Sequence, residues 1–195
     1  MSRADNYSLL LLAGGKSKRM GADKAKLLYN GKTFVDNLID KAKCLGITKV
    51  YLSGYSTPIG DAEVVPDLYP EVGPLGGIHA GLCKVETPYC MVLPVDVPQI
   101  PVEFLEELLV YHGEKCTPLD GKQLPLVLER QDFLEPLIGV YPTSMSSFLE
   151  ERIEAQVLSV FRMVKAWGYE SYHSNIEPSK IANINTKEDY ERLIK

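Results

Sequence analysis

A glycine-rich, cationic stretch, LLAGGKSKRMGADKAK, spans residues 11–26 and directly follows an apolar run. Five cations and one anion fall within it, although the whole chain carries a net charge of −5. Glycines after a strand let the backbone approach a ligand closely and leave N–H groups free for phosphate oxygens. An arginine fork suits two phosphate oxygens, and a lysine supplies a point charge. The stretch therefore predicts a phosphate-binding loop.

Two common phosphate loops do not match this spacing. The P-loop pattern requires a first glycine where the chain has Leu10, and Gly14, Gly15 and Gly21 do not have the spacing of the dinucleotide fingerprint. Arg19 and Lys24 sit in a fixed frame, G-G-x-S-x-R-M-G-x-D-K. These two cations are the candidates for phosphate binding, and the neighbouring lysines are interpreted as solvated surface residues.

Two further segments carry candidate site residues. Asp96 follows the apolar run MVLPV, so it points into the crevice at the strand ends where the glycine loop lies. Mg²⁺ in nucleotide sites is held by one or two carboxylates plus phosphate oxygens, and Asp96 is the candidate; a turn-forming aspartate is the alternative. Gly76 and Gly77 lie in VGPLGGIHAGL, where glycines favour close packing against a strand or a ligand.

The elements that must position these residues alternate between strands and helices. The expected strands are residues 8–12, 49–53, 63–65 and 89–95, and the expected helices are residues 33–45, 76–84 and 101–113. Residues 124–141 predict two strands inserted at one edge, followed by helices at 144–153 and 157–167, a strand at 169–172 and a helix capped by Thr186. The fold class is α/β: a single Rossmann-like three-layer sandwich, mostly parallel, with an antiparallel insertion in the C-terminal half.

Length and composition set limits on the protein class. With 195 residues, 45% hydrophobic and 24% charged, the chain fits one globular domain covering residues 1–195. The acidic balance argues against general nucleic-acid binding. No run approaches the roughly 18 apolar residues of a membrane span, and the first apolar run is too short for a signal peptide. We therefore expect no membrane partner and a cytoplasmic location.

The full frame L-A-G-G-x-S-x-R-M-G-x-D-K-A resembles the molybdenum cofactor guanylyltransferase family, nucleotidyltransferases with a GT-A-like α/β fold. The segment with Asp67 before Gly-Pro-Leu-Gly-Gly, the Pro-x-Asp-x-Pro segment at Asp96 and the segment NINTKED are also similar to the family. The resemblance implies a nucleotide-binding half of about 1–112 and an acceptor-binding half of about 113–195. The chain differs from the family pattern at Ser53, where the family often has Asn, and at Glu135, where it usually has Gln or His.

The resemblance also implies roles for individual residues. Nucleotide contacts would fall on Leu12, Ala13, Gly14, Gly15, Ser53, Asp67 and Gly76; the outer phosphates on Arg19; the α-phosphate on Lys24; and Mg²⁺ on Asp96. Asn183 and Asn185 would face the metal or the second substrate. Arg19, Lys24 and Asp96 are the expected catalytic residues.

The resulting expectation is transfer of GMP from GTP to the terminal phosphate of molybdopterin, with release of pyrophosphate. Mg²⁺ is the expected cofactor, and the expected partners include proteins that deliver or accept the molybdenum cofactor. Two alternatives stay open at this point. One is a related nucleotidyltransferase that uses CTP with molybdopterin or another phosphorylated acceptor, and the other is a non-catalytic nucleotide-binding protein.

Overall fold

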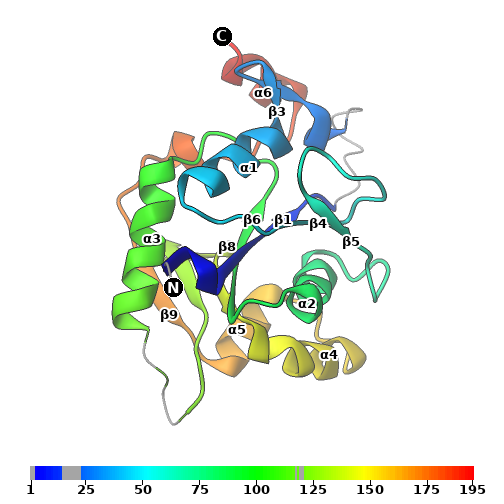
Figure 1. Ribbon diagram of the computed structural model, residues 1–195, viewed down its shortest axis with the longest axis vertical. Coiled ribbons are helices and arrows are strands. Elements are labelled where there is room, and N and C mark those ends of the chain that lie inside the picture. Colours follow the sequence, from blue (N-terminus) through cyan, green and yellow to red (C-terminus); the bar gives the residue numbers. More distant parts are fainter. Residues whose placement is uncertain (1–2, 15–22, 117, 119–120) are drawn as a thin grey trace.

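A seven-stranded sheet forms the centre of the computed structural model, which describes residues 3–14, 23–116, 118 and 121–195 (Figure 1). Its strand order is β5-β4-β1-β6-β8-β7-β9. The strands are β1 (Tyr7–Leu12), β4 (Val50–Ser53), β5 (Glu63–Val65), β6 (Tyr89–Pro94), β7 (Leu126–Arg130), β8 (Phe133–Pro142) and β9 (Glu170–His173). β8 is antiparallel to both of its neighbours, whereas the other pairings are parallel. The mostly parallel α/β sheet predicted from the sequence is confirmed.

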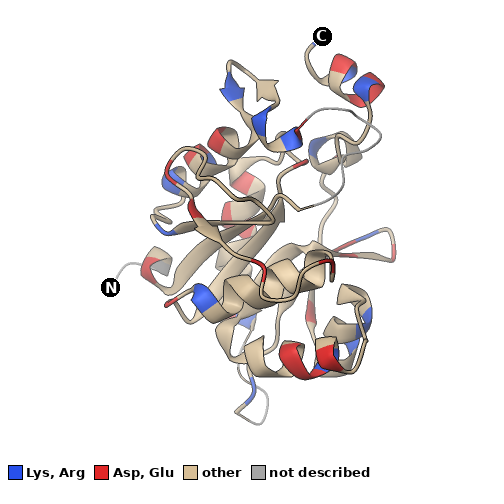
Figure 2. Cartoon of the chain, turned by 90° about the vertical axis from the view of Figure 1, so that its right-hand side faces the viewer, with Lys and Arg blue, Asp and Glu red and all other residues tan. Residues whose placement is uncertain are grey.

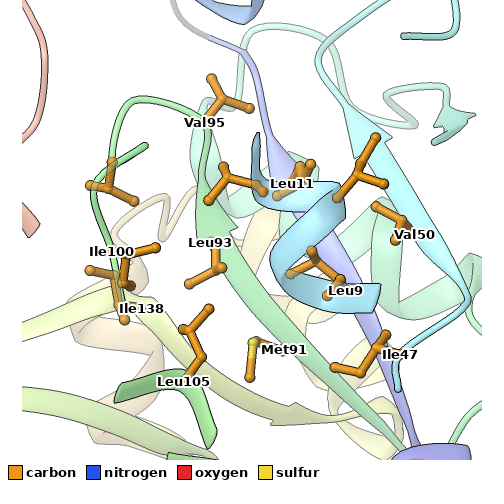
Figure 3. Close-up of a cluster of buried hydrophobic side chains, with 14 of the residues drawn as sticks. Leu9, Leu11, Ile47, Val50, Met91, Leu93, Val95, Ile100, Leu105 and Ile138 are labelled. Carbon is orange, nitrogen blue, oxygen red and sulfur yellow. The ribbon is translucent and has the colours of Figure 1, made fainter. Parts of the chain in front are cut away.

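Helices cover both faces of this sheet. The helices are α1 (Phe34–Cys44), α2 (Pro74–Lys84), α3 (Val102–Lys115), α4 (Ser146–Glu154), α5 (Val160–Trp167) and α6 (Lys187–Leu193). Figure 1 shows α1 and α3 on one side and α2, α4 and α5 on the other. The buried apolar side chains form two clusters that divide in the same way. Leu9 and Leu11 belong to the cluster with residues of α1 and α3 (Figure 3), whereas Leu10 and Leu12 belong to the cluster with residues of α2. A strand buried on both faces explains the unbroken leucine run.

The C-terminal half differs from the prediction in where its strands lie. The two predicted strands were expected as an insertion at one edge of the sheet. The structure instead places β8 between β6 and β7, and β9 beyond β7 forms the outer edge. Only β8 reverses direction, because it returns from β7 through the tight turn at Gln131 and Asp132, both of which have positive φ angles.

Two helix ends and one small hairpin complete the framework. α3 was predicted to end before Gly113 but continues to Lys115. The capping box of α6 is confirmed, since Thr186 accepts from the Asp189 N–H and the Asp189 side chain accepts from the Thr186 N–H. The prediction missed the antiparallel pair β2 (Leu28–Tyr29) and β3 (Lys32–Thr33), which lies beside α6 at the top of Figure 1.

The surface carries charged residues of both signs. Figure 2 shows cationic and anionic segments interspersed on the face turned to the viewer. Within the described ranges, no helix is long and apolar enough to cross a bilayer.

A buried histidine ties α3 to the amino-terminal end of the sheet. His112 is 3% exposed, shares a hydrogen bond of 2.8 Å with the Tyr7 hydroxyl, and meets the Tyr89 ring edge-on at 4.5 Å. Burial lowers the pKa of His112 to about 4, because the charged imidazolium would lose its hydration. His112 is therefore neutral in the folded protein at neutral pH.

Replacing His112 with glutamine is expected to flatten the pH dependence of stability between about pH 4 and 6.5. In this window the unfolded chain binds a proton at His112 that the folded chain does not, so the free energy of unfolding falls as pH is lowered. The contribution of this histidine amounts to about 3 kcal/mol across the window. Urea unfolding at pH 7.5, 6 and 4.5 measures it, with His173→Gln as the matched control for replacing an exposed histidine. Equal slopes in wild type and His112→Gln would contradict the assignment.

Candidate active site

The carboxyl ends of four parallel strands meet along one edge of the sheet. β1 lies between β4 and β6 and runs parallel to both. The chain reaches β4 from β1 through α1 on one face, and it reaches β6 from β5 through α2 on the other. The crevice at such a reversal of strand order is where α/β proteins bind ligands.

Lys24 connects three distant parts of the chain at this crevice. Its Nζ donates hydrogen bonds to Asp96 Oδ2 at 2.8 Å and to Asn185 Oδ1 at 2.6 Å. The Lys24 and Asp96 side chains are 15% and 16% exposed. Asp96 Oδ1 is buried and has no hydrogen-bond partner among the described residues. The carboxylate thus uses one oxygen for the lysine and keeps the other available for a further ligand.

The backbone around Lys24 is held by a capping aspartate and a tyrosine. Lys24 begins the 3₁₀ helix η2 (Lys24–Lys26), which Asp23 caps by accepting from the Ala25 N–H at 3.2 Å. The Tyr55 hydroxyl, from the loop after β4, donates a hydrogen bond to the same Asp23 carboxylate. Burial, with the hydrogen bond to Asp23 as the second cause, raises the pKa of Tyr55 to about 12. Tyr55 therefore stays a hydrogen-bond donor at neutral pH.

The segment carrying Asn185 is fixed by the start of α6. The Asn185 N–H donates to Asp189 Oδ2 at 3.1 Å, and the Ile184 N–H donates to the Asp96 carbonyl at 2.9 Å. Hydrogen bonds from the Asn185 N–H and from Thr186 lower the pKa of Asp189. The capping box therefore also positions the asparagine that contacts Lys24.

A cleft of about 610 Å³ opens beside this cluster at the ends of β1, β4 and β5. Its lining residues are Leu12, Gly14, Ser53, Gly54, Asp67, Glu71, Gly73, Pro74 and Gly77. Ser53 is 2% exposed, and its hydroxyl donates to Asp67 Oδ1 at 3.4 Å. The volume is typical of a small-molecule site, and the Asp67 and Glu71 carboxylates offer acceptors to ligand N–H and O–H groups.

Two glycines are required by close approaches along this cleft. Gly54 has φ +75°, and a Cβ there would lie 2.4 Å from the Gly14 Cα. A Cβ on Gly77 would lie 2.5 Å from the Ser53 Oγ. The loops after β1 and β4 therefore touch through their backbones, which sets the width of the cleft.

Gly54→Ala is expected to destabilise the fold and to distort the cleft, because the new methyl group collides with the Gly14 backbone at a φ angle that residues other than glycine rarely adopt. The expected loss is roughly 2–4 kcal/mol. Gly31→Ala is the matched control: Gly31 has φ +77° with open space around it, so only the backbone cost of about 1 kcal/mol applies. Chemical unfolding of the two variants and of wild type measures both losses. Equal losses in the two variants would contradict the close-approach argument.

A second cavity of about 460 Å³ lies toward β6, β7 and β8. Its lining includes Pro74, which also lines the first cleft, Pro94 at the end of β6, and Asn183. Asn183 lies two residues before Asn185, and Pro94 lies two residues before Asp96. Both cavities therefore have lining residues close to Asp96, since the carbonyl of Leu12 in the first cleft also accepts from the Val95 N–H at 3.1 Å.

The donor set at Asp96 fits a divalent cation shared with a ligand. Within the described ranges, no cluster of three or more His, Cys, Asp or Glu residues could hold a metal by itself. Mg²⁺ needs no such cluster, because it typically binds through one or two carboxylates together with substrate phosphates and water. The buried, unpartnered Oδ1 of Asp96 is a suitable oxygen for such a cation.

The model of the MobA-like NTP transferase domain matches residues 9–165 of the chain. The chain belongs to this family. The match covers the glycine-rich stretch of residues 11–26, Asp96 and the lining of both cavities apart from residues 181–183.

Relatives of known name support membership of the family. A probable molybdenum cofactor guanylyltransferase from Flavobacterium johnsoniae is 29% identical over 97% of each chain. A molybdenum cofactor guanylyltransferase from Pseudomonas fluorescens is 30% identical over 93% of this chain and 90% of the relative. The crystal structure of molybdopterin-guanine dinucleotide biosynthesis protein A from Archaeoglobus fulgidus is 25% identical, with a TM-score of 0.76 over 95% of this chain and 96% of that one.

The structure places the predicted site residues in three locations: the first cleft, the cluster around Lys24, and the second cavity. Leu12, Gly14, Ser53 and Asp67 line the first cleft, Lys24, Asp96 and Asn185 form the cluster, and Asn183 lines the second cavity. Ala13 lies beside the cleft, with its N–H bonded to the Ser53 carbonyl at 2.9 Å. Gly76 is not in the lining, because its Cβ position faces Val72 and the Tyr69 carbonyl, each 3.2 Å away. Gly15 and Arg19 lie outside the described residues.

Several residues that line the first cleft or support Lys24 were not predicted from the sequence. Gly54, Glu71, Gly73 and Pro74 line the first cleft, and Tyr55 supports Lys24 through Asp23. Gly54 had an available signal, since it directly follows the strand VYLS as Gly14 follows β1. Tyr55 had none, because its partner is 32 residues away.

Proposed function

We propose that this chain transfers GMP from GTP to the terminal phosphate of molybdopterin and releases pyrophosphate. The observation that carries the proposal is the Lys24 ammonium, which donates hydrogen bonds to Asp96 and Asn185 at the carboxyl ends of the parallel strands. We assign the first cleft to the nucleotide and the second cavity to the acceptor. The names of the relatives point to the same reaction.

The proposed chemistry is an in-line displacement at phosphorus. An oxygen of the acceptor phosphate forms a bond to the α-phosphorus of GTP, and the bond from that phosphorus to the β-bridging oxygen breaks as pyrophosphate leaves. The acceptor oxygen is already anionic, so no strong general base is required. Lys24 neutralises charge on the α-phosphate, and the residues of the two cavities hold the reactants in line.

Asp96 is proposed to hold Mg²⁺ through its free Oδ1. The cation would supply charge neutralisation on the phosphate oxygens. Asn185 keeps Lys24 directed at the transfer point, and Arg19 is proposed for the outer phosphates. A cytoplasmic location and partner proteins that deliver or accept the cofactor stay predictions.

The cleft chemistry favours guanine as the base. The Asp67 and Glu71 carboxylates of the cleft lining follow β5, whereas Lys24 bonds Asp96 after β6, and two strands separate β5 from β6 in the sheet. Guanine presents adjacent N1–H and 2-amino donors, which a carboxylate can accept together. The cationic end would then meet the triphosphate, and the acidic end would meet the base or the ribose.

Thermal unfolding with GTP, CTP, ATP and UTP, each with and without Mg²⁺, tests the nucleotide. A ligand at 100 times its Kd stabilises by about 2.7 kcal/mol, so the preferred nucleotide gives the largest shift. We expect GTP with Mg²⁺ to give that shift, and molybdopterin with GTP to give pyrophosphate and the guanine dinucleotide. A larger shift with CTP would favour the cytidylyl alternative. GTP binding without pyrophosphate release would indicate a non-catalytic protein.

A further inference from the structure

The second cavity is built by an irregularity in the sheet. The β7–β8 register pairs Val127 with Gly139 and then Leu128 with Glu135, so Pro136–Ile138 bulge out of the ladder. These three residues line the cavity. The fully buried Tyr141 hydroxyl donates to the Pro136 carbonyl and holds the bulge in place. Bulges of this kind redirect side chains next to ligand sites.

An arginine–glutamate pair supplies the charged groups of this cavity. Arg130 and Glu135 are diagonal neighbours across the β7–β8 ladder, and Arg130 Nη2 lies 3.0 Å from Glu135 Oε1. The side chains are 20% and 42% exposed. Arg130 Nε is buried and has no hydrogen-bond partner in the part of the chain that the structure describes. A buried donor without a partner is costly, so a ligand acceptor at this position would be favoured.

We propose that Arg130 and Glu135 recognise the hydrogen-bonding edge of a neutral, flat heterocycle in the acceptor, namely the 2-amino-4-oxo edge of a pterin ring. This inference rests on the proposed function for the identity of the acceptor. Glu135 accepts from the ring N–H and the 2-amino group, and Arg130 Nε donates to the ring carbonyl. A guanidinium beside a carboxylate carries no net charge, so this end of the cavity suits a neutral ring better than a second phosphate.

The rest of the cavity agrees with a flat ring whose phosphate reaches the transfer point. Pro94, Leu137 and Leu158 provide apolar surface for the ring faces. Asn183 and Pro94 lie toward the Lys24–Asp96 pair, because the Ile184 N–H bonds the Asp96 carbonyl. A ligand held at Arg130 by its ring therefore extends its other end toward Asp96. In this arrangement Arg130 and Glu135 determine which acceptor binds and take no part in bond making.

The test compares Arg130→Gln and Glu135→Gln with wild type and with the exposed control Arg192→Gln. At saturating Mg²⁺ and GTP, the KM for purified molybdopterin is expected to rise about tenfold or more in each variant, with little change in kcat. The KM for GTP and the GTP-induced thermal shift should stay at wild-type values. Neopterin, whose fluorescence reports its own binding, is expected to bind wild type and Arg192→Gln and to bind both cavity variants at least several-fold more weakly.

The outcomes separate this inference from the proposed function. If wild type binds neopterin and the variants do not, yet no guanylyl transfer occurs, the pterin site stands and the proposed reaction fails. Unchanged acceptor KM and unchanged neopterin affinity in the variants overturn the inference, as does a wild type that binds no neopterin. A rise in the KM for GTP would place the guanine base at this pair and overturn it too. Arg130→Lys keeps the charge without the fork and should bind neopterin as weakly as Arg130→Gln, provided its unfolding midpoint matches wild type.

Discussion

Asp96→Ala is expected to lower the rate of pyrophosphate release by roughly 10³-fold while leaving the fold intact. Asp96 holds Lys24 through Oδ2 and has a buried Oδ1 that accepts no hydrogen bond from any described residue. Removing the carboxylate removes both the proposed cation ligand and the partner of Lys24. Stability should change much less than activity, because Lys24 keeps Asn185 as a partner and the substitution also removes a buried oxygen that lacks a hydrogen-bond partner.

Asp96→Asn separates charge from hydrogen bonding at this position. The amide oxygen can still accept from Lys24, yet it binds a cation far more weakly than a carboxylate does. We therefore expect Asp96→Asn to be nearly as inactive as Asp96→Ala and to respond little to added Mg²⁺. The exposed Asp61→Asn serves as the control for removing a negative charge. Turnover at saturating substrates and urea unfolding are the measurements, and wild-type-like pyrophosphate release from Asp96→Ala would contradict the mechanism.

The architecture of the first half was predictable because its signals are local. The apolar runs at β1 and β6 are buried on both faces, which only a parallel sheet covered by helices provides. Gly46, which has a φ angle of +77°, follows the end of α1 and is the only glycine in the sequence between Gly31 and Gly54. Each of these elements depends on residues that are close in sequence, so composition and spacing were sufficient.

The second half was harder to predict because its arrangement depends on pairing between distant segments. The sequence does not encode locally that β8 pairs with β6, or that the ladder skips Pro136–Ile138. Gly113 also misled the prediction of a helix end. The cost of a glycine in a helix is only about 1 kcal/mol, and the last turn continues past Gly113 until the Cys116 N–H bonds the His112 carbonyl at 3.2 Å.

The candidate site shows the same division between local and distant signals. Lys24, Asp96 and Asn185 were each marked by a motif, and the structure brings them together across separations of 72 and 161 residues. Tyr55 and Arg130 were not marked, because their roles depend on the partners Asp23 and Glu135 and on a strand register that sequence spacing does not reveal. Residues that act through a neighbour are therefore the ones that the sequence alone missed.

Lys24→Met is expected to reduce kcat by roughly 10²–10³-fold, because it removes the cation that we propose neutralises the α-phosphate. Lys24→Arg should not restore activity: the arginine fork is planar and longer, and it cannot place one point charge between Asp96 and Asn185. Lys26→Met is the matched control, since Lys26 lies in the same 3₁₀ helix with a side chain that is 63% exposed. It should retain nearly full activity.

A metal-binding measurement distinguishes two roles of Lys24: neutralising the α-phosphate, as proposed, or only holding Asp96 in place. In the nucleotide-free protein Lys24 neutralises Asp96, so the ammonium opposes any cation at Oδ1 through electrostatic repulsion. Lys24→Met should therefore bind Mg²⁺ or Mn²⁺ at least as tightly as wild type in a calorimetric titration without nucleotide, although its turnover is low. Weakened metal binding together with a lowered unfolding midpoint would instead show that Lys24 acts by holding Asp96 in place, and the proposed role at the α-phosphate would then be wrong.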